Sequence, residues 1–98
     1  MMIATLPTQE QVDGIARTLA PDVVQIRFNP AEDWTGDPAI YFRVVLSDDA
    51  ARERLHEIAT AVRDRMYDEL QLRESGYFPY FNFRSLSENV KLLDSHWG

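Results

Sequence analysis

The spacing of hydrophobic and polar residues changes along the chain and predicts the elements of a small α+β domain. Thr8 and Gln11 have the spacing of a capping box, and apolar residues recur after them on one helical face. This first helix should end at Ala20, because the proline that follows disfavours helical backbone. Residues 23–28 and 39–46 then alternate apolar and polar side chains, which is the period of a strand. We therefore expect a helix followed by an antiparallel hairpin.

The pattern of a long helix follows the second strand and leads to a third strand. Residues 47–49 can cap a helix that ends near Gly76. Residues 80–84 alternate again, and residues 86–98 predict either a short final helix or a frayed tail. Residues 1–98 should thus form a single α+β domain in the order helix, strand, strand, helix, strand, with helices on one face of a mostly antiparallel three-stranded sheet. The apolar stripe of the long helix is Leu55, Ile58, Val62, Met66 and Leu70.

The face of this sheet that points away from the helices carries the candidate binding residues. Phe28, Phe42, Phe81 and Phe83 have the parity of the core, so their neighbours should lie on the opposite face. Tyrosine and arginine are enriched in binding hot spots. These residues are also common on solvent-exposed sheet faces that bind nothing, where the arginines pair with nearby acids. Both interpretations, a binding face and a solvated face, are open. The residues proposed to bind a partner are Arg27, Tyr41, Arg43, Tyr80, Asn82 and Arg84, together with Trp34 in the loop between the first two strands.

That loop, residues 29–38, combines carboxylates with a tryptophan. Glu32, Asp33 and Asp37 lack the regular spacing of oxygen ligands in a calcium loop, so no metal site is predicted. A solvated turn with Trp34 folded back on the core is the expected structure. Contact of Trp34 with a partner is the alternative.

Composition and charge narrow the class of protein. The chain has no cysteine, which excludes disulfides and thiolate chemistry and fits a reducing compartment. Its 16 acidic and 10 basic residues give a net charge of −6, which argues against unspecific binding to nucleic acid and suits a basic protein partner. No apolar run has the length of a membrane span and the first residues do not resemble a signal peptide, so we expect a cytoplasmic protein.

No catalytic residue and no cofactor is predicted. Glu53 and His56 have the Glu-x-x-His spacing of di-iron helices, but such sites need two copies of the motif. The chain has no P-loop, no dinucleotide fingerprint and no Gly-x-Ser-x-Gly motif. The expectation is therefore a protein that is not an enzyme.

Residues 36–50 and 77–88, "GDPAIYFRVVLSDDA" and "YFPYFNFRSLSE", carry a family resemblance. They resemble small uncharacterised bacterial and archaeal proteins that are encoded beside HEPN-type helical proteins, a class that includes toxin ribonucleases of toxin–antitoxin pairs. The resemblance implies a noncatalytic companion or antitoxin that binds a HEPN-like partner. The Gly-Ser pair and Asp-x-Asp motif of the nucleotidyltransferases that also accompany HEPN proteins are absent, so the implied action is occlusion by binding.

Two alternatives use the same residues. A small RNA-binding protein could stack bases on the tyrosines of the sheet face. A homodimer could form instead, by pairing two copies of the third strand at an exposed sheet edge.

Overall fold

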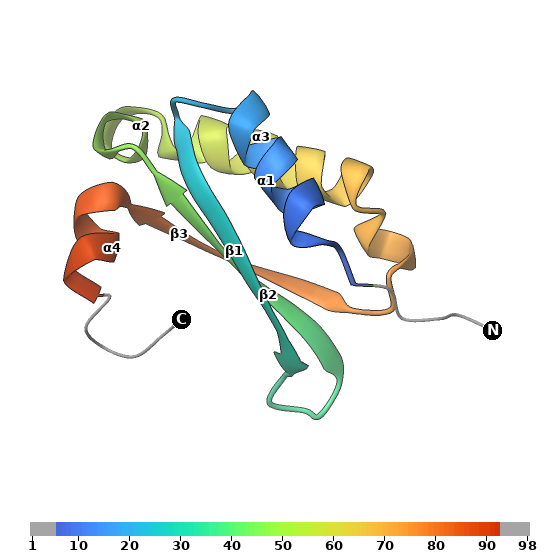
Figure 1. Ribbon diagram of the computed structural model, residues 1–98. Coiled ribbons are helices and arrows are strands. Elements are labelled where there is room, and N and C mark those ends of the chain that lie inside the picture. Colours follow the sequence, from blue (N-terminus) through green and yellow to red (C-terminus); the bar gives the residue numbers. More distant parts are fainter. Residues whose placement is uncertain (1–5, 93–98) are drawn as a thin grey trace.

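Residues 6–92, the part of the chain that the computed structural model describes, form three strands and the helices that surround them (Figure 1). Thr8 caps the first helix as predicted, since its hydroxyl accepts a hydrogen bond from the Gln11 amide while the Gln11 side chain accepts one from the Thr8 amide. The strands are β1 (Val23–Glu32), β2 (Pro38–Leu46) and β3 (Phe78–Ser85). The helices are α1 (Gln9–Thr18), α2 (Asp48–Glu53), α3 (Leu55–Glu69), the 3-10 helix η1 (Leu72–Glu74) and α4 (Leu86–Leu92).

The sheet is mixed, with β2 in the centre. β1 and β2 form the predicted antiparallel hairpin. β3 pairs parallel to β2, from Ala39 opposite Phe78 to Leu46 opposite Ser85, so the prediction of a mostly antiparallel sheet was wrong for this pair. The reason is the crossover through residues 47–77, which returns the chain to the end of the sheet where β2 begins. Alternation identifies a strand, but it does not give the strand's direction.

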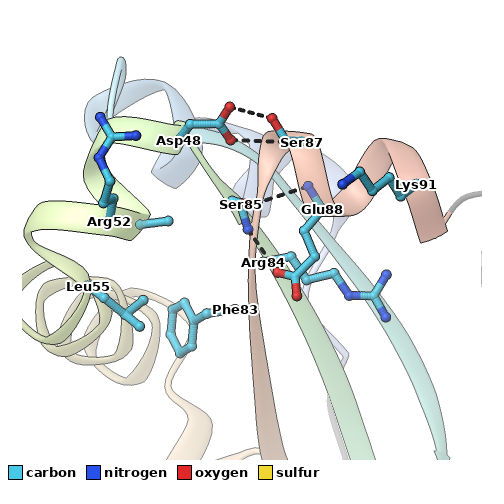
Figure 2. A pocket seen from close by; sticks show the side chains of 10 residues that line it. Asp48, Arg52, Leu55, Phe83, Arg84, Ser85, Ser87, Glu88 and Lys91 are labelled. Atoms are coloured by element: carbon cyan, nitrogen blue, oxygen red, sulfur yellow. Dashed lines mark hydrogen bonds between the residues drawn. The ribbon is translucent and has the colours of Figure 1, made fainter.

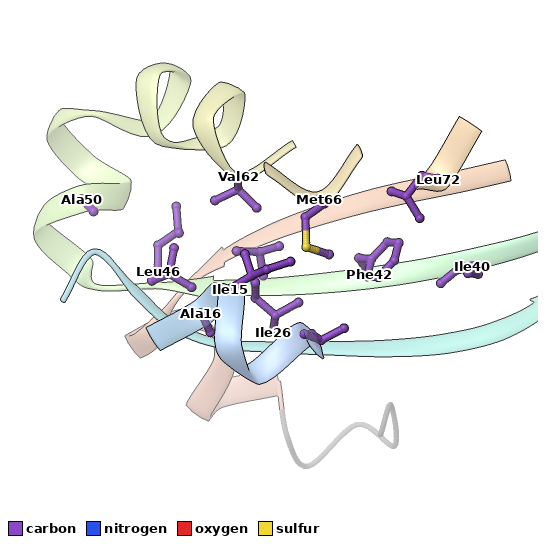
Figure 3. Close-up of a cluster of buried hydrophobic side chains, with 13 residues drawn as sticks. Ile15, Ala16, Ile26, Ile40, Phe42, Leu46, Ala50, Val62, Met66 and Leu72 are labelled. Atoms are coloured by element: carbon purple, nitrogen blue, oxygen red, sulfur yellow. The ribbon is translucent and has the colours of Figure 1, made fainter. Parts of the chain in front are cut away.

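The core lies between one face of the sheet and helices α1 and α3 (Figure 3). Phe42, at the centre of β2, is 1% exposed. Its ring contacts the rings of both neighbouring strands, with centroids 6.2 Å from Phe28 and 5.2 Å from Phe81. Phe83 also packs against this core, so the predicted parity of all four phenylalanines is confirmed. Buried side chains that the helices contribute include Val12, Ile15, Val62 and Met66.

The predicted long helix is interrupted at Arg54. The backbone of Arg54 leaves the helical region with φ −138°, and its guanidinium group donates to both carboxylate oxygens of Asp22, at 3.0 and 2.7 Å. This contact joins two residues that are far apart in the sequence: Asp22 lies just before β1, and Arg54 lies between α2 and α3. The break turns Leu55 out of the predicted apolar stripe, and Leu55 is 47% exposed.

Helix α4 lies on the opposite side of the sheet from α1 and α3, so the prediction of helices on one face was wrong for α4 (Figure 1). It contacts both β2 and β3, and its own residue Asn89 is buried. Of the two alternatives for the end of the chain, residues 86–92 form the short helix, and residues 93–98 lie outside the described range. Helix α4 therefore covers this side of the sheet at the C-terminal ends of β2 and β3.

Replacement of Phe42 tests the assignment of the core face. Phe42→Ala should lower the free energy of unfolding by about 3–5 kcal/mol, because it removes a fully buried ring. Urea unfolding followed by circular dichroism measures the change. The matched control is Phe78→Ala, which removes the same ring from a side chain that is 58% exposed and should cost less than about 1 kcal/mol. Similar losses in the two variants would contradict the assignment.

Candidate binding face

Strand register brings most of the predicted binding residues onto one face of the sheet. Residues directly opposite each other on neighbouring strands share a face. Arg27 lies opposite Arg43, which lies opposite Asn82, and Tyr41 lies opposite Tyr80. We call this surface the second face; its residues are Arg27, Tyr41, Arg43, Phe78, Tyr80, Asn82 and Arg84.

Three aromatic rings lie in a row on the second face, at the end near the β1–β2 loop. The Tyr41 and Tyr80 rings are stacked, with centroids 5.0 Å apart and an angle of 13° between their planes. Phe78 continues the row at 5.0 Å from Tyr80. Sequence reasoning missed Phe78 because Pro79 suggested a later start for the strand, although Phe78 has the same parity as Tyr80. Phe78 is exposed while Tyr41 and Tyr80 are half-buried, and accessible aromatic rings are enriched in binding surfaces.

Arginines occupy the adjoining part of the second face. Arg27 is exposed, Arg84 is partly buried and Arg43 is 2% exposed. Burial lowers the pKa of Arg43, and the like charges of Arg84 and Arg27 lower it further. Arginine nevertheless remains protonated in proteins, so three positive charges are concentrated here on a chain with a net charge of −6.

The arginines of the edge strands are not paired with acids in the described part of the chain. Ion pairs between residues 6–92 involve Arg52, Arg54 and Arg65, and none includes Arg27 or Arg84. The interpretation in which cross-strand acids pair with these two arginines is therefore not supported within this range.

Burial of Arg43 changes its expected role. The sequence suggested a surface residue, but the side chain lies beneath its neighbours and is not available for direct contact across a flat interface. Substitution by glutamate would place a carboxylate in a buried position and destabilise the fold. Arg27, which is exposed on the adjoining strand, is the better position to test binding alone.

A cavity of about 210 Å³ opens on the second face between the tyrosines and the arginines. Tyr41, Tyr80, Asn82 and Arg84 line it together with Arg43. Atom Nη1 of Arg84 is buried and has no hydrogen-bond acceptor among residues 6–92. A buried donor without an acceptor is costly, so an acceptor that reached this guanidinium group would be stabilising.

The β1–β2 loop is an ordered turn that contacts the second face through Tyr80. Asp33 accepts hydrogen bonds from the amide and hydroxyl of Thr35, at 2.9 and 2.6 Å, and from the amide of Asp37 at 3.0 Å. These bonds, the Thr35 hydroxyl first, hold the pKa of Asp33 below its ordinary value. The Tyr80 hydroxyl donates to the other oxygen of Asp33 at 3.3 Å. The carboxylate of Asp33 thus organises the turn.

Trp34 projects from this turn and is 92% exposed, so the expectation that it folds back on the core was wrong. The hydrogen bonds around Asp33 hold the flanking backbone in the turn without using the indole. Among residues 6–92, no group of three or more histidine, aspartate and glutamate side chains is arranged to hold a metal ion. No helix in the same range is both long and apolar enough to cross a membrane.

A second hollow, of about 600 Å³, lies where β2 and β3 end and α2 and α4 begin (Figure 2). Ser85 and Glu88 form a capping box at the start of α4, with hydrogen bonds of 3.1 and 3.3 Å. Asp48 at the start of α2 accepts hydrogen bonds from the amide of Ser87, at 3.0 Å, and from its hydroxyl. The serines and acids that line the hollow are thus used to hold two helix ends together, and Figure 2 shows these contacts at its upper rim.

Comparison of the chain with protein-family models, with curated proteins and with solved structures found no match. The fold and the site themselves define the class: a small α+β protein with a mixed three-stranded sheet and a basic, aromatic second face.

The contact between Asp48 and Ser87 predicts a contribution to stability that depends on pH. Hydrogen bonds from Ser87 lower the pKa of Asp48 in the folded protein. The stabilisation is therefore complete above the pKa of the unfolded chain and is lost as the pH falls through the folded pKa. NMR titration should show the Asp48 midpoint rising towards its ordinary value in Ser87→Ala. An unchanged midpoint in that variant would contradict the proposed cause.

Proposed function

We propose that this protein is a noncatalytic interaction module that binds a protein partner with its second face. The observation that carries the proposal is that a row of partly exposed aromatic rings adjoins edge-strand arginines that form no ion pair within residues 6–92, on the side of the sheet away from α1 and α3. Tyrosine and arginine are enriched among the few residues that dominate the binding energy of protein interfaces. Phe78, at 58% exposed, Arg27 and Asn82 are the exposed members of the face.

The ends of the second face limit how a partner can approach. Helix α4 covers one end, and the β1–β2 loop with Trp34 lies at the other (Figure 1). A partner that contacts the face between them is also within reach of Trp34, whose exposed indole can add contact area outside the sheet. This arrangement supports the inclusion of Trp34 among the binding residues.

The resemblance described above supports a HEPN-like protein as the partner and an antitoxin or companion role that acts by occlusion. Its two sequence stretches contain the neighbouring strands β2 and β3, each followed by a serine-capped helix. The contacts of these motifs are structural, since Ser47 and Ser85 cap helices and Asp48 contacts Ser87. Identification of the partner therefore rests on the resemblance alone.

Protein binding is favoured over RNA binding by the state of the tyrosine rings. Single-stranded RNA is bound by exposed ring faces on which bases stack. Tyr41 and Tyr80 already stack on each other, so each has one face in use. The net charge of −6 also opposes the approach of a polyanion.

Charge reversal of Arg27 tests the proposal. The chain should form a stable hetero-complex when it is co-expressed with the product of its neighbouring gene, with the mass measured by light scattering. Arg27→Glu should weaken this complex at least about tenfold, since it places a carboxylate in a basic patch. The melting temperature of the free protein should hardly change, because Arg27 is exposed and forms no ion pair within residues 6–92.

The matched control is Arg63→Glu, the same charge reversal at an exposed residue of α3. Equal weakening by both variants would indicate a general charge effect and contradict the assignment of the face. A homodimer without any hetero-complex would replace a foreign partner with self-association. Binding to single-stranded RNA that weakens steeply with salt would support the RNA-binding alternative instead.

A further inference from the structure

The cavity on the second face has the chemistry of a site for one small anion. Its lining includes Arg43 and Arg84 together with Asn82, whose side-chain amide can donate two hydrogen bonds. Tyr41 and Tyr80 form the wall at the other side. The cavity is thus lined by donor-bearing residues of two neighbouring strands, β2 and β3, together with two tyrosines.

Arg84, which lines this cavity, carries a donor that lacks an acceptor among residues 6–92. Its Nη1 atom is buried and makes no hydrogen bond with the described residues, and its charge takes part in no ion pair among them. The like charges of Arg27 and Arg43 lie on the neighbouring strands, so an anion here would reduce their mutual repulsion as well. The Arg84 donor without an acceptor and the positive potential of the neighbouring arginines both favour a negatively charged acceptor.

The size and walls of the cavity favour a carboxylate on a side chain over a larger phosphorylated ligand. A volume of about 210 Å³ is below the ~300–1,000 Å³ typical of pockets that enclose whole small molecules. It suits the end of one side chain, whose aliphatic carbons can lie against the tyrosine rings. The guanidinium fork matches a carboxylate with two parallel hydrogen bonds. The acidic total charge disfavours ligands that carry several phosphates.

We propose that the cavity is an anchoring site for a single aspartate or glutamate side chain of the protein partner, held by Arg84 and Asn82. The inference rests on the proposed function and adds the chemistry of the group that the partner inserts. Arg84 and Asn82 bind the carboxylate, Arg43 supplies positive potential from below, and the stacked tyrosines exclude water from one side. The remainder of the second face then contributes shape complementarity around this anchor.

Titration of the free protein with sodium acetate tests the anchor without any partner. Acetate should bind with an affinity on the order of millimolar, and the Arg84 Nε–Hε and Asn82 side-chain amide signals should shift and saturate in ¹H–¹⁵N spectra. Sodium chloride at equal ionic strength should give no saturating shift. Arg84→Gln should weaken acetate binding at least about tenfold, whereas Arg63→Gln should leave it unchanged. Asn82→Ala, at an exposed residue, gives a second test if Arg84→Gln lowers folding.

Three results would overturn the inference: shifts that do not saturate, equal binding by Arg84→Gln and wild type, or phosphate binding about tenfold tighter than acetate at the same signals. Failure of this titration is distinct from failure of the proposed function. A stable hetero-complex that depends on Arg27, in a protein without the acetate site, would reject only the anchor. Saturable acetate binding without any hetero-complex would support the anion site and reject the protein partner.

Discussion

Parallel pairing of β2 with β3 aligns two strands that carry their aromatic and basic residues in the same order. Tyr41 precedes Arg43 on β2, and Tyr80 precedes Arg84 on β3. Because the strands run in the same direction, Tyr41 meets Tyr80, and the arginines gather beyond them. An antiparallel β3 would reverse this order and place its tyrosine towards the arginine of β2. The separation of the second face into an aromatic end and a basic end therefore depends on the direction of one strand.

That direction depends in turn on contacts that hold the crossover. Helices α2 and α3 return the chain across the core, and the break between them is held by the two hydrogen bonds from Arg54 to Asp22. At the far end of the strands, Asp48 and Ser87 join the starts of α2 and α4, which lie on different sides of the sheet. The contact between Asp48 and Ser87 thus holds α4 at the end of the second face that this helix covers.

Much of this fold is readable from local sequence, and the exceptions come from contacts between distant residues. The capping box at Thr8, the hairpin and the core parity of the phenylalanines follow from spacing over a few residues. The helix break at Arg54 does not, because it depends on Asp22, 32 positions earlier. The direction of β3 is likewise set by the whole crossover and leaves no trace in the alternation of its residues.

In the candidate site, too, the sequence predicts which face of the sheet a residue lies on but not how deeply its side chain is buried. Alternation places Arg27, Arg43 and Arg84 on one face, but it cannot tell that Arg43 in the central strand is 2% exposed while Arg27 at the edge is exposed. A central strand has neighbours on both sides, so its side chains are covered first when larger residues flank them. The residues of the second face would therefore act in two ways. Edge-strand residues can contact a partner directly, whereas Arg43 contributes positive charge beneath them. Exposure of Trp34 follows the same logic, because the turn around Asp33 satisfies its own backbone and needs no packing from the indole.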